Sequence, residues 1–158
     1  MQGFFDGFSE VLRILKIIVT TKIFYVTFFT WFFAQTLKVL FFFAAKRKFD
    51  FRLFVGTGGM PSSHTASVTA LTTCIGLTTG WNSPVFMVAL CFCIVVISDA
   101  IGVRRAAGKQ AVLLNKIMDD MWTSEFKYEK RLKEWLGHTP MEAIAGLIIG
   151  ILLPVIMY

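Results

Sequence analysis

The sequence is short of charged residues. Only 16% of its 158 residues are Asp, Glu, Lys or Arg, against roughly 25% in an average soluble domain. Hydrophobic residues reach 56% and include 17 Phe, and the mean hydropathy is +0.67. A soluble chain of this length exposes too much of its surface to carry so much apolar area. The composition therefore excludes an ordinary soluble domain and predicts an integral membrane protein, whose apolar faces lipid can cover.

Cysteine is scarce as well, and its positions argue against disulfides and metal ligation. Cys74, Cys91 and Cys93 lie within apolar runs. An odd, buried set is not a disulfide framework, and Cys91-x-Cys93 does not match a metal-ligand spacing. We interpret the three as small packing residues. The acidic residues form no cluster suited to a divalent ion, so we expect neither a metal nor another cofactor.

The N-terminal segment lacks the compact apolar stretch and the small-residue cleavage site of a secretory signal. Apolar residues instead recur there at helical spacing, with charged residues between them. This pattern predicts an amphipathic helix on the membrane surface, although a short membrane-inserted helix remains an alternative. The apolar positions are Phe4, Phe5, Phe8, Val11, Leu12, Leu15 and Ile18.

Four apolar runs are candidates for membrane crossings. They cover residues 23–45, 66–79, 84–98 and 143–158. A span needs about 20 largely apolar residues, so the second and fourth runs are short. We predict an all-α bundle of about four transmembrane helices, in a single domain over residues 1–158.

Basic residues are concentrated between these runs. Twelve of the 16 Lys and Arg residues lie in segments 46–52 and 104–133, which share one side of the membrane if all four runs cross. The positive-inside rule places that side in the cytoplasm and both chain ends on the opposite face. The net charge of +6 then reflects topology and contact with anionic lipids, and we expect no nucleic-acid partner. Residues 104–135 are too polar to cross; the pattern predicts an interfacial helix followed by a solvated stretch over 119–133.

The first polar cluster precedes the second run. Residues 58–65 read Gly-Gly-Met-Pro-Ser-Ser-His-Thr. A Gly- and Ser-rich turn at a helix N-terminus offers backbone N–H groups and hydroxyls to an anion. An ordinary helix capped by Ser62 or Ser63 explains the same pattern, but the adjacent His64 favours a functional site.

The second cluster closes the third run and consists of Asp99, Arg104 and Arg105. Paired arginines at a helix exit either snorkel to lipid headgroups or clamp a phosphate in bidentate fashion. A carboxylate within an apolar run is costly and needs a partner, which one of the arginines or a histidine can supply.

The third cluster opens the fourth run. His138 and Glu142 are four residues apart and therefore share one helical face. A carboxylate one turn away can hold an imidazole in a single tautomer and make it more nucleophilic. The alternative is a helix start with Glu in its first turn, where the helix dipole favours a negative charge.

The predicted topology brings these three clusters to one membrane face. Two histidines, several cations and a Ser-rich helix N-terminus are the groups that phosphoryl transfer needs. Cations neutralise the phosphate oxygens, one His attacks phosphorus, and the other protonates the leaving alkoxide.

Pro-Ser-Ser-His at 61–64 resembles the PSGH signature of the PAP2 (phosphatidic-acid-phosphatase-type) and vanadium-haloperoxidase superfamily. The pattern HxxxExxxGxxxG at 138–150 resembles the last motif of that superfamily, in which an Asp usually takes the place of the Glu. Together, the segments GGMPSSHTA, SDAIGVRRAAGKQA and LGHTPMEAIAG resemble the divergent PAP2 family of small membrane proteins, over residues 31–150.

The resemblance implies a role for each matching residue. His138 would be the nucleophile that forms a phosphohistidine, with Glu142 as the carboxylate that orients it. His64 would be the general acid, and Ser62 and Ser63 would hold the phosphate.

The sequence also departs from the superfamily pattern. The arginine expected six residues before the nucleophile would fall on Leu132, so Arg104 or Arg105 must substitute for it. The KxxxxxxRP motif is absent, and Lys38 and Arg52 are the best replacements. Four spans are fewer than the six usual in membrane PAP2 enzymes, so the core is either minimal or completed by a second subunit in a homo-oligomer.

The resemblance and the polar clusters thus predict a membrane lipid phosphatase that works without metal or vanadate. We expect its site at the cytoplasmic face of a bacterial or organellar membrane. Phosphatidylglycerophosphate, which is made on that leaflet, is the leading substrate, and phosphatidic acid and isoprenyl phosphates follow. Two alternatives remain open: a lipid-phosphate-binding or scaffolding protein without turnover, and a small anionic-lipid transporter, suggested by Gln35, Lys38 and Asp99 within spans.

Overall fold

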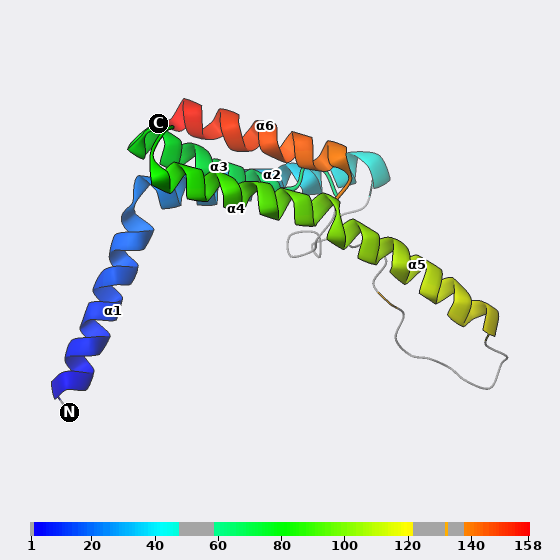
Figure 1. Cartoon of the computed structure of the whole chain (residues 1–158), viewed down its shortest axis with the longest axis horizontal. Helices are drawn as coiled ribbons and strands as arrows, with labels where there is room; N and C mark the ends of the chain where they lie inside the picture. The colour runs from blue at the N-terminus through cyan, green and yellow to red at the C-terminus, as the bar shows by residue number, and fades with distance from the viewer. Residues whose placement is uncertain (1, 48–58, 122–131, 133–137) are drawn as a thin grey trace.

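The computed structural model describes residues 2–47, 59–121, 132 and 138–158. Within them lie α1 (Gln2–Thr20), α2 (Lys22–Lys46), α3 (Ser63–Thr79), α4 (Pro84–Ile101), α5 (Val103–Met121) and α6 (Pro140–Met157) (Figure 1). These described parts of the chain contain no strand. The prediction of an all-α membrane bundle with an N-terminal amphipathic helix is confirmed.

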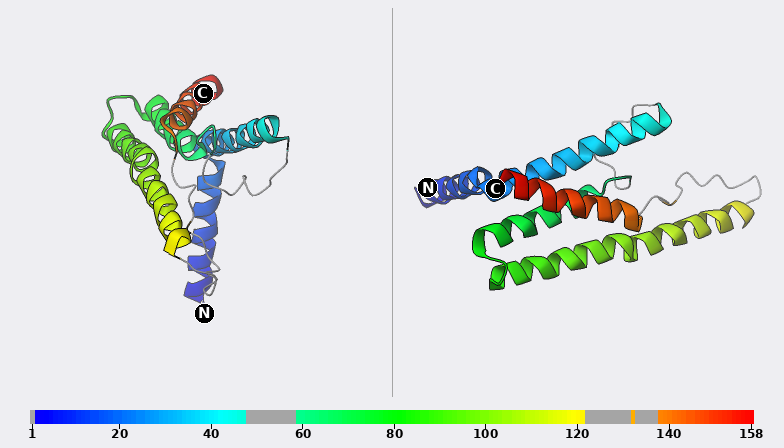
Figure 2. Two further views of the ribbon diagram at one scale, coloured as in Figure 1. Left: turned by 90° about the vertical axis from the view of Figure 1, so that its right-hand side faces the viewer. Right: turned by 90° about the horizontal axis from the view of Figure 1, so that it is seen from above.

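Helix α3 is the centre of the bundle. It packs against α2, α4 and α6, whereas α4 and α6 touch each other only sparsely (Figure 2). Its many threonines suit this position because their hydroxyls bond within the helix. Thr72 and Thr73 donate to the carbonyl oxygens of Val68 and Thr69, each at 2.9 Å. The small threonine side chains thus pack against neighbouring helices without leaving polar atoms unsatisfied.

Two glycines of α6 set its distance from α3. A Cβ atom at Gly146 would collide with the carbonyl oxygen of Ser62, and one at Gly150 would lie 2.6 Å from the carbonyl oxygen of Ala66. Glycines four residues apart share a helical face and let two helix backbones touch. This close crossing brings the start of α6 against the start of α3.

Three helical stretches among the described residues are long and apolar enough to cross a membrane: Lys22–Ala44, Pro84–Asp119 and Pro140–Met157. The second predicted crossing, over residues 66–79, corresponds to α3, whose 17 residues span about 26 Å, slightly less than the roughly 30 Å hydrocarbon core. Because three helices enclose α3, its surface does not need to be strongly apolar. Its sequence therefore gave a weaker signal than those of the helices around it.

Helices α1 and α5 leave the bundle at opposite ends (Figure 1). Helix α1 contacts only α2 among the described helices and exposes its apolar side chains, Phe8, Val11, Leu12, Leu15 and Ile18 among them. Helix α5 continues α4 past Gly102, and the combined stretch Pro84–Asp119, at about 54 Å, is longer than the membrane core. Most of the solvated stretch predicted over 119–133 lies outside the described residues.

The two ends of the bundle are distinct. Helix α2 ends, α3 begins, α4 ends and α6 begins at one end, whereas α1 joins α2 beside Tyr158 at the other (Figure 1). At that other end Lys22 Nζ donates a hydrogen bond to the carbonyl oxygen of Tyr158 at 3.2 Å. The structure therefore brings the three polar clusters together, as the topology predicted.

Candidate active site

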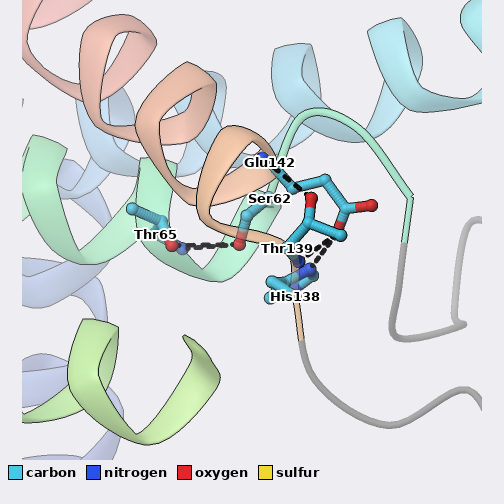
Figure 3. Close-up of polar contacts among 5 residues, drawn as sticks. All are labelled: Ser62, Thr65, His138, Thr139 and Glu142. Carbon is cyan, nitrogen blue, oxygen red and sulfur yellow. Dashed lines mark hydrogen bonds and ion pairs between the residues drawn. The ribbon is translucent and has the colours of Figure 1, made fainter. Parts of the chain in front are cut away.

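The site is organised around the first turn of α6, which is closed by a capping box. Thr139 Oγ1 accepts a hydrogen bond from the Glu142 backbone N–H at 3.3 Å, and Glu142 Oε2 accepts one from the Thr139 N–H at 3.2 Å. The same Oε2 atom lies 3.0 Å from His138 Nδ1 (Figure 3). Glu142 thus caps the helix and holds the imidazole, so the two interpretations of the sequence pattern apply together.

This contact selects one form of the ring. When Nδ1–H donates to the carboxylate, the lone pair of His138 resides on Nε2, the nitrogen that can act as nucleophile. His138 is 5% exposed, and its backbone N–H donates to the carbonyl oxygen of Ala100 at 2.9 Å. The ring is therefore fixed both by α6 and by the end of α4.

A second backbone bond connects α3 to α6. The Ser62 N–H donates to the carbonyl oxygen of Glu142 at 3.0 Å. Sequence reasoning missed this bond and that of His138 to Ala100, because peptide groups occur at every residue and leave no residue-type signal. Together the two bonds hold the starts of α3 and α6 and the end of α4 as one unit.

His64 lies in the first turn of α3, exposed and opposite His138. The two ring centroids are 6.2 Å apart, with the planes inclined by 46°. Lys38 and Arg104 are close enough to His64 to interact with it electrostatically. The two histidines therefore face each other in a cationic environment.

Lys38 reaches this environment from inside the bundle, where a lysine within a span avoids contact with lipid. It is 2% exposed, and its charge interacts with that of Glu142. A Cβ atom at Gly59 would lie 3.2 Å from Lys38 Cγ, and Gly59 also has a φ of +90°. Glycine at this position therefore satisfies both the backbone turn and the close packing against the lysine stem. Gln35, one turn before Lys38, is buried too.

Asp99 has the arginine partner that its position required. Arg104 Nε donates to Asp99 Oδ2 at 2.6 Å, and both side chains are partly exposed. This charge-assisted bond uses only Nε, so the terminal guanidinium nitrogens remain able to donate to another oxyanion. Arg105 is exposed at the next position of α5, and Arg52 lies outside the described residues.

The serines are buried rather than open to solvent. Ser62 Oγ caps α3, accepting from the Thr65 backbone N–H at 3.3 Å and from Thr65 Oγ1 at 3.0 Å, close to His138 and Glu142 (Figure 3). Ser63 is 1% exposed. The capping alternative for Ser62 is therefore realised. As the first residues of the helix, Ser63 and His64 have backbone N–H groups without an intrahelical acceptor, which suits an anion.

Asn115 of α5 is a residue that sequence reasoning overlooked. It is 3% exposed, its Nδ2 donates to the carbonyl oxygen of Leu132 at 3.0 Å, and its Oδ1 accepts from the Leu132 N–H at 3.1 Å. The amide thus holds the backbone six residues before His138, where the superfamily has an arginine. An uncharged polar side chain in the apolar part of α5 was the available signal.

Comparison with known sequences identifies the family. The family model described as "Divergent PAP2 family" matches residues 19–153, which include α2 to α5 and most of α6. The chain belongs to the divergent PAP2 family. The uncharacterized membrane protein YuiD of Bacillus subtilis (strain 168) is 43% identical, over 79% of this chain and 86% of that protein. No solved structure matches the chain.

This divergent PAP2 protein thus combines, at one end of a membrane bundle, two facing histidines, a carboxylate that orients one of them, and cations from α2 and α5. The arrangement offers a nucleophile, a proton donor and positive charge within one small volume. Such groups are chemically suited to phosphoryl transfer.

Proposed function

We propose that this divergent PAP2 protein hydrolyses a lipid phosphomonoester through a phosphohistidine on His138. The observation that carries the proposal is the contact of 3.0 Å between His138 Nδ1 and Glu142 Oε2, with the His64 ring centred 6.2 Å from that of His138. An oriented nucleophile and a proton donor on opposite sides of one gap are suited to an in-line displacement at phosphorus.

In the first step the Nε2 lone pair of His138 attacks phosphorus. The bond from phosphorus to the lipid oxygen breaks, and this oxygen takes its electron pair and a proton from the protonated His64. The dephosphorylated lipid alcohol leaves, and His138 becomes a phospho-imidazolium whose positive charge Glu142 stabilises.

In the second step water hydrolyses the phosphohistidine. His64, now neutral, takes a proton from the water, whose oxygen attacks phosphorus as the phosphorus–nitrogen bond breaks. Inorganic phosphate leaves, His138 recovers its Nε2 lone pair, and His64 is protonated again. Arg104, Lys38 and the N-terminus of α3 neutralise the phosphoryl oxygens during both displacements, with Arg105, Ser63 and Arg52 as further candidates.

The distribution of charge supports a substrate on the cytoplasmic leaflet. The basic segments 46–52 and 104–133 adjoin in sequence the helix termini at the histidine end of the bundle, and the positive-inside rule favours the cytoplasmic side for this end. Phosphatidylglycerophosphate on that leaflet is the best candidate, ahead of phosphatidic acid and isoprenyl phosphates. Its phosphomonoester would project from the headgroup region towards the histidine pair.

The test is phosphate release from a panel of lipid phosphates in detergent micelles. Wild-type protein should release phosphate, and His138→Ala should lose nearly all activity. His64→Ala should lose roughly 10²–10⁴-fold, the usual contribution of a general acid. With ³²P-labelled lipid, wild type should carry an acid-labile label that His138→Ala lacks. Equal release by wild type and both variants would refute the assignment, and loss in His64→Ala alone would mean that His138 is not the nucleophile.

The burial of His138, at 5% exposed, favours a second candidate: binding of a lipid phosphate without turnover. Leu132 in place of the superfamily arginine points the same way, because it removes one cation from the transition state. Saturable binding of phosphatidylglycerophosphate vesicles without phosphate release would support this candidate over catalysis.

Topology has its own test. In a background without native cysteines, Arg47→Cys and Lys109→Cys should react with an impermeant maleimide from the cytoplasmic side only. Asn82→Cys, in the turn at the other end of the bundle, should react only from the opposite side. Labelling of Arg47→Cys and Lys109→Cys from different sides would contradict the convergence of the clusters.

A further inference from the structure

The proposed chemistry leaves a large cavity unused. It has a volume of about 280 Å³ and lies between α3, α4 and α6, lined by Thr69 and Thr73, Leu90 and Ile94, and Leu147 and Ile151, among others. We refer to it as the lateral cavity. Because α4 and α6 touch only sparsely while both pack on α3, α3 forms its floor and the other two helices its walls.

The lateral cavity is apolar although threonines line it. Thr72 Oγ1 donates to the carbonyl oxygen of Val68 at 2.9 Å, with the carbonyl oxygen of Ala89 at 3.2 Å, and Thr73 Oγ1 donates to that of Thr69 at 2.9 Å. The Thr69 hydroxyl pairs with Cys93 Sγ at 3.6 Å. With every lining hydroxyl engaged, a polar ligand would lose its hydration without replacement, whereas a hydrocarbon chain would lose nothing.

The lateral cavity runs from the neighbourhood of the site towards the opposite end of the bundle. It begins one helical turn from the site, since Thr69 is four residues after Thr65, and Ile97 is three residues before Ala100. Its wall on α4 runs from Phe86 to Ile97, eleven residue steps or about 17 Å, close to half of the roughly 30 Å hydrocarbon core. The lateral cavity is therefore about as long as one acyl chain, and it ends at the first turn of α4, away from His138.

Two aromatic residues mark the far end. Trp81 follows α3 and Phe86 lies in the first turn of α4, and their rings meet edge to face with centroids 5.2 Å apart. A Cβ atom at Gly76 would collide with the Trp81 ring, so only glycine at this position leaves room for the indole. The lateral cavity thus closes near the end of the bundle opposite His138.

We propose that the lateral cavity binds one hydrocarbon chain of the same lipid whose phosphate reaches His138. This inference rests on the proposed function and adds a second recognition element to it. The headgroup is bound by charge at the membrane surface, and the chain is bound by shape within the bundle. The protein should therefore discriminate lipid phosphates by chain length as well as by headgroup.

The kinetic test compares the KM of a variant whose new tryptophan fills the lateral cavity with that of a variant whose tryptophan lies at a neighbouring position outside it. Leu147→Trp places a large ring in the cavity, whereas Ile148→Trp adds the same ring at the next, exposed position outside it. With long-chain phosphatidic acid, Leu147→Trp should raise KM on the order of tenfold, the scale of effect of overpacking an apolar site. With dihexanoyl phosphatidic acid its KM should match wild type, and Ile148→Trp should match wild type with both substrates.

A second cavity variant on α4, with its own control, keeps the test usable if Leu147→Trp does not fold. Ile94→Trp lines the lateral cavity and Val95→Trp does not, and both positions are exposed enough to accept the ring. Equal KM changes in the cavity variant and its control, in both pairs, would overturn the inference. So would a KM defect of the same size with long-chain and short-chain substrates.

A binding test separates this inference from the proposed catalysis. Phosphatidic acid with a photoreactive diazirine at the end of one acyl chain is incorporated into phosphatidylcholine nanodiscs with the His138→Ala protein. Mass spectrometry should find crosslinks on Leu90, Ile94 or Ile151, and unlabelled phosphatidic acid should compete with them. Competition by added phosphatidylcholine to the same extent would mean that bulk lipid fills the lateral cavity, and would overturn the inference. Specific crosslinking without phosphate release by wild type would refute the phosphatase and leave the chain site standing.

Discussion

The shared oxygen of Glu142 allows its two roles to be separated by mutation. Glu142→Gln keeps an oxygen that can accept from the Thr139 N–H and from His138 Nδ1–H, but removes the negative charge. Thr139→Ala keeps the charge, but removes the hydroxyl that accepts from the Glu142 N–H at 3.3 Å. The first change therefore affects the charge of the site, and the second affects the helix cap.

The two variants should change different quantities: Glu142→Gln changes kcat, and Thr139→Ala changes the free energy of unfolding. A unit charge about 4 Å from the developing imidazolium contributes roughly 4 kcal/mol at an effective dielectric constant of about 20, which corresponds to about 10³-fold in rate. Glu142→Gln should lower kcat by about that factor while changing the melting temperature little. Thr139→Ala should lower the free energy of unfolding by about 0.5–2 kcal/mol, the usual contribution of an N-cap, and leave kcat within about threefold of wild type.

The assay measures single-turnover phosphate release and thermal unfolding of both variants in the same detergent. Glu142→Asp serves as a further control, because it restores the charge on the shorter side chain that the superfamily uses. We expect it to recover part of the activity that Glu142→Gln loses. A kcat for Glu142→Gln within about tenfold of wild type would refute the electrostatic reasoning. So would a Thr139→Ala variant that loses as much activity as Glu142→Gln.

Three further predictions concern the scaffold around the site. Gly150→Ala should lower the free energy of unfolding by about 1–3 kcal/mol in thermal denaturation, because its Cβ would overlap the backbone of α3, whereas Gly7→Ala, with open space around it, should not. Asp99→Asn should raise KM several-fold with a smaller effect on kcat, because Arg104 loses its charge-assisted bond of 2.6 Å; an unchanged KM in steady-state assays would contradict this. Asn115→Leu should cost about 1–3 kcal/mol of stability by leaving two backbone groups without partners, and Asn115→Asp, which keeps the acceptor, should cost less.

Much of the fold could be predicted because lipid-facing helices must be apolar along their length. Helices α2, α4 and α6 correspond to the first, third and fourth apolar runs. Helix α3 gave a weaker signal because it lies inside the bundle, where threonine and glycine pack better than large apolar residues. Its role as the centre of the bundle depends on which helices surround it, and a single helix's pattern does not contain that information.

The candidate site could be predicted as far as its side chains were concerned. The spacing paired His138 with Glu142 correctly, although His138 precedes the N-cap Thr139 and therefore lies just outside α6 rather than on its face. The common end of α3, α4 and α6 followed from counting crossings. What the sequence could not provide were the bonds of His138 N–H to Ala100 and of Ser62 N–H to Glu142, because peptide groups are common to all residues. It also presented a helix start with Glu142 in its first turn and the orientation of His138 as alternatives, although one carboxylate oxygen accepts both hydrogen bonds.

The near-continuous rod of α4 and α5 has a mechanical consequence. About half of the stretch Pro84–Asp119 lies beyond the bundle, so the part outside is a lever of about 28 Å. A change of 10° in the tilt of α4 would displace the far end of α5 by roughly 5 Å, and bilayer thickness is what sets such tilts. Because Asn115 on that lever is hydrogen-bonded to the backbone of Leu132, a thicker or thinner bilayer would also displace Leu132, six residues before His138.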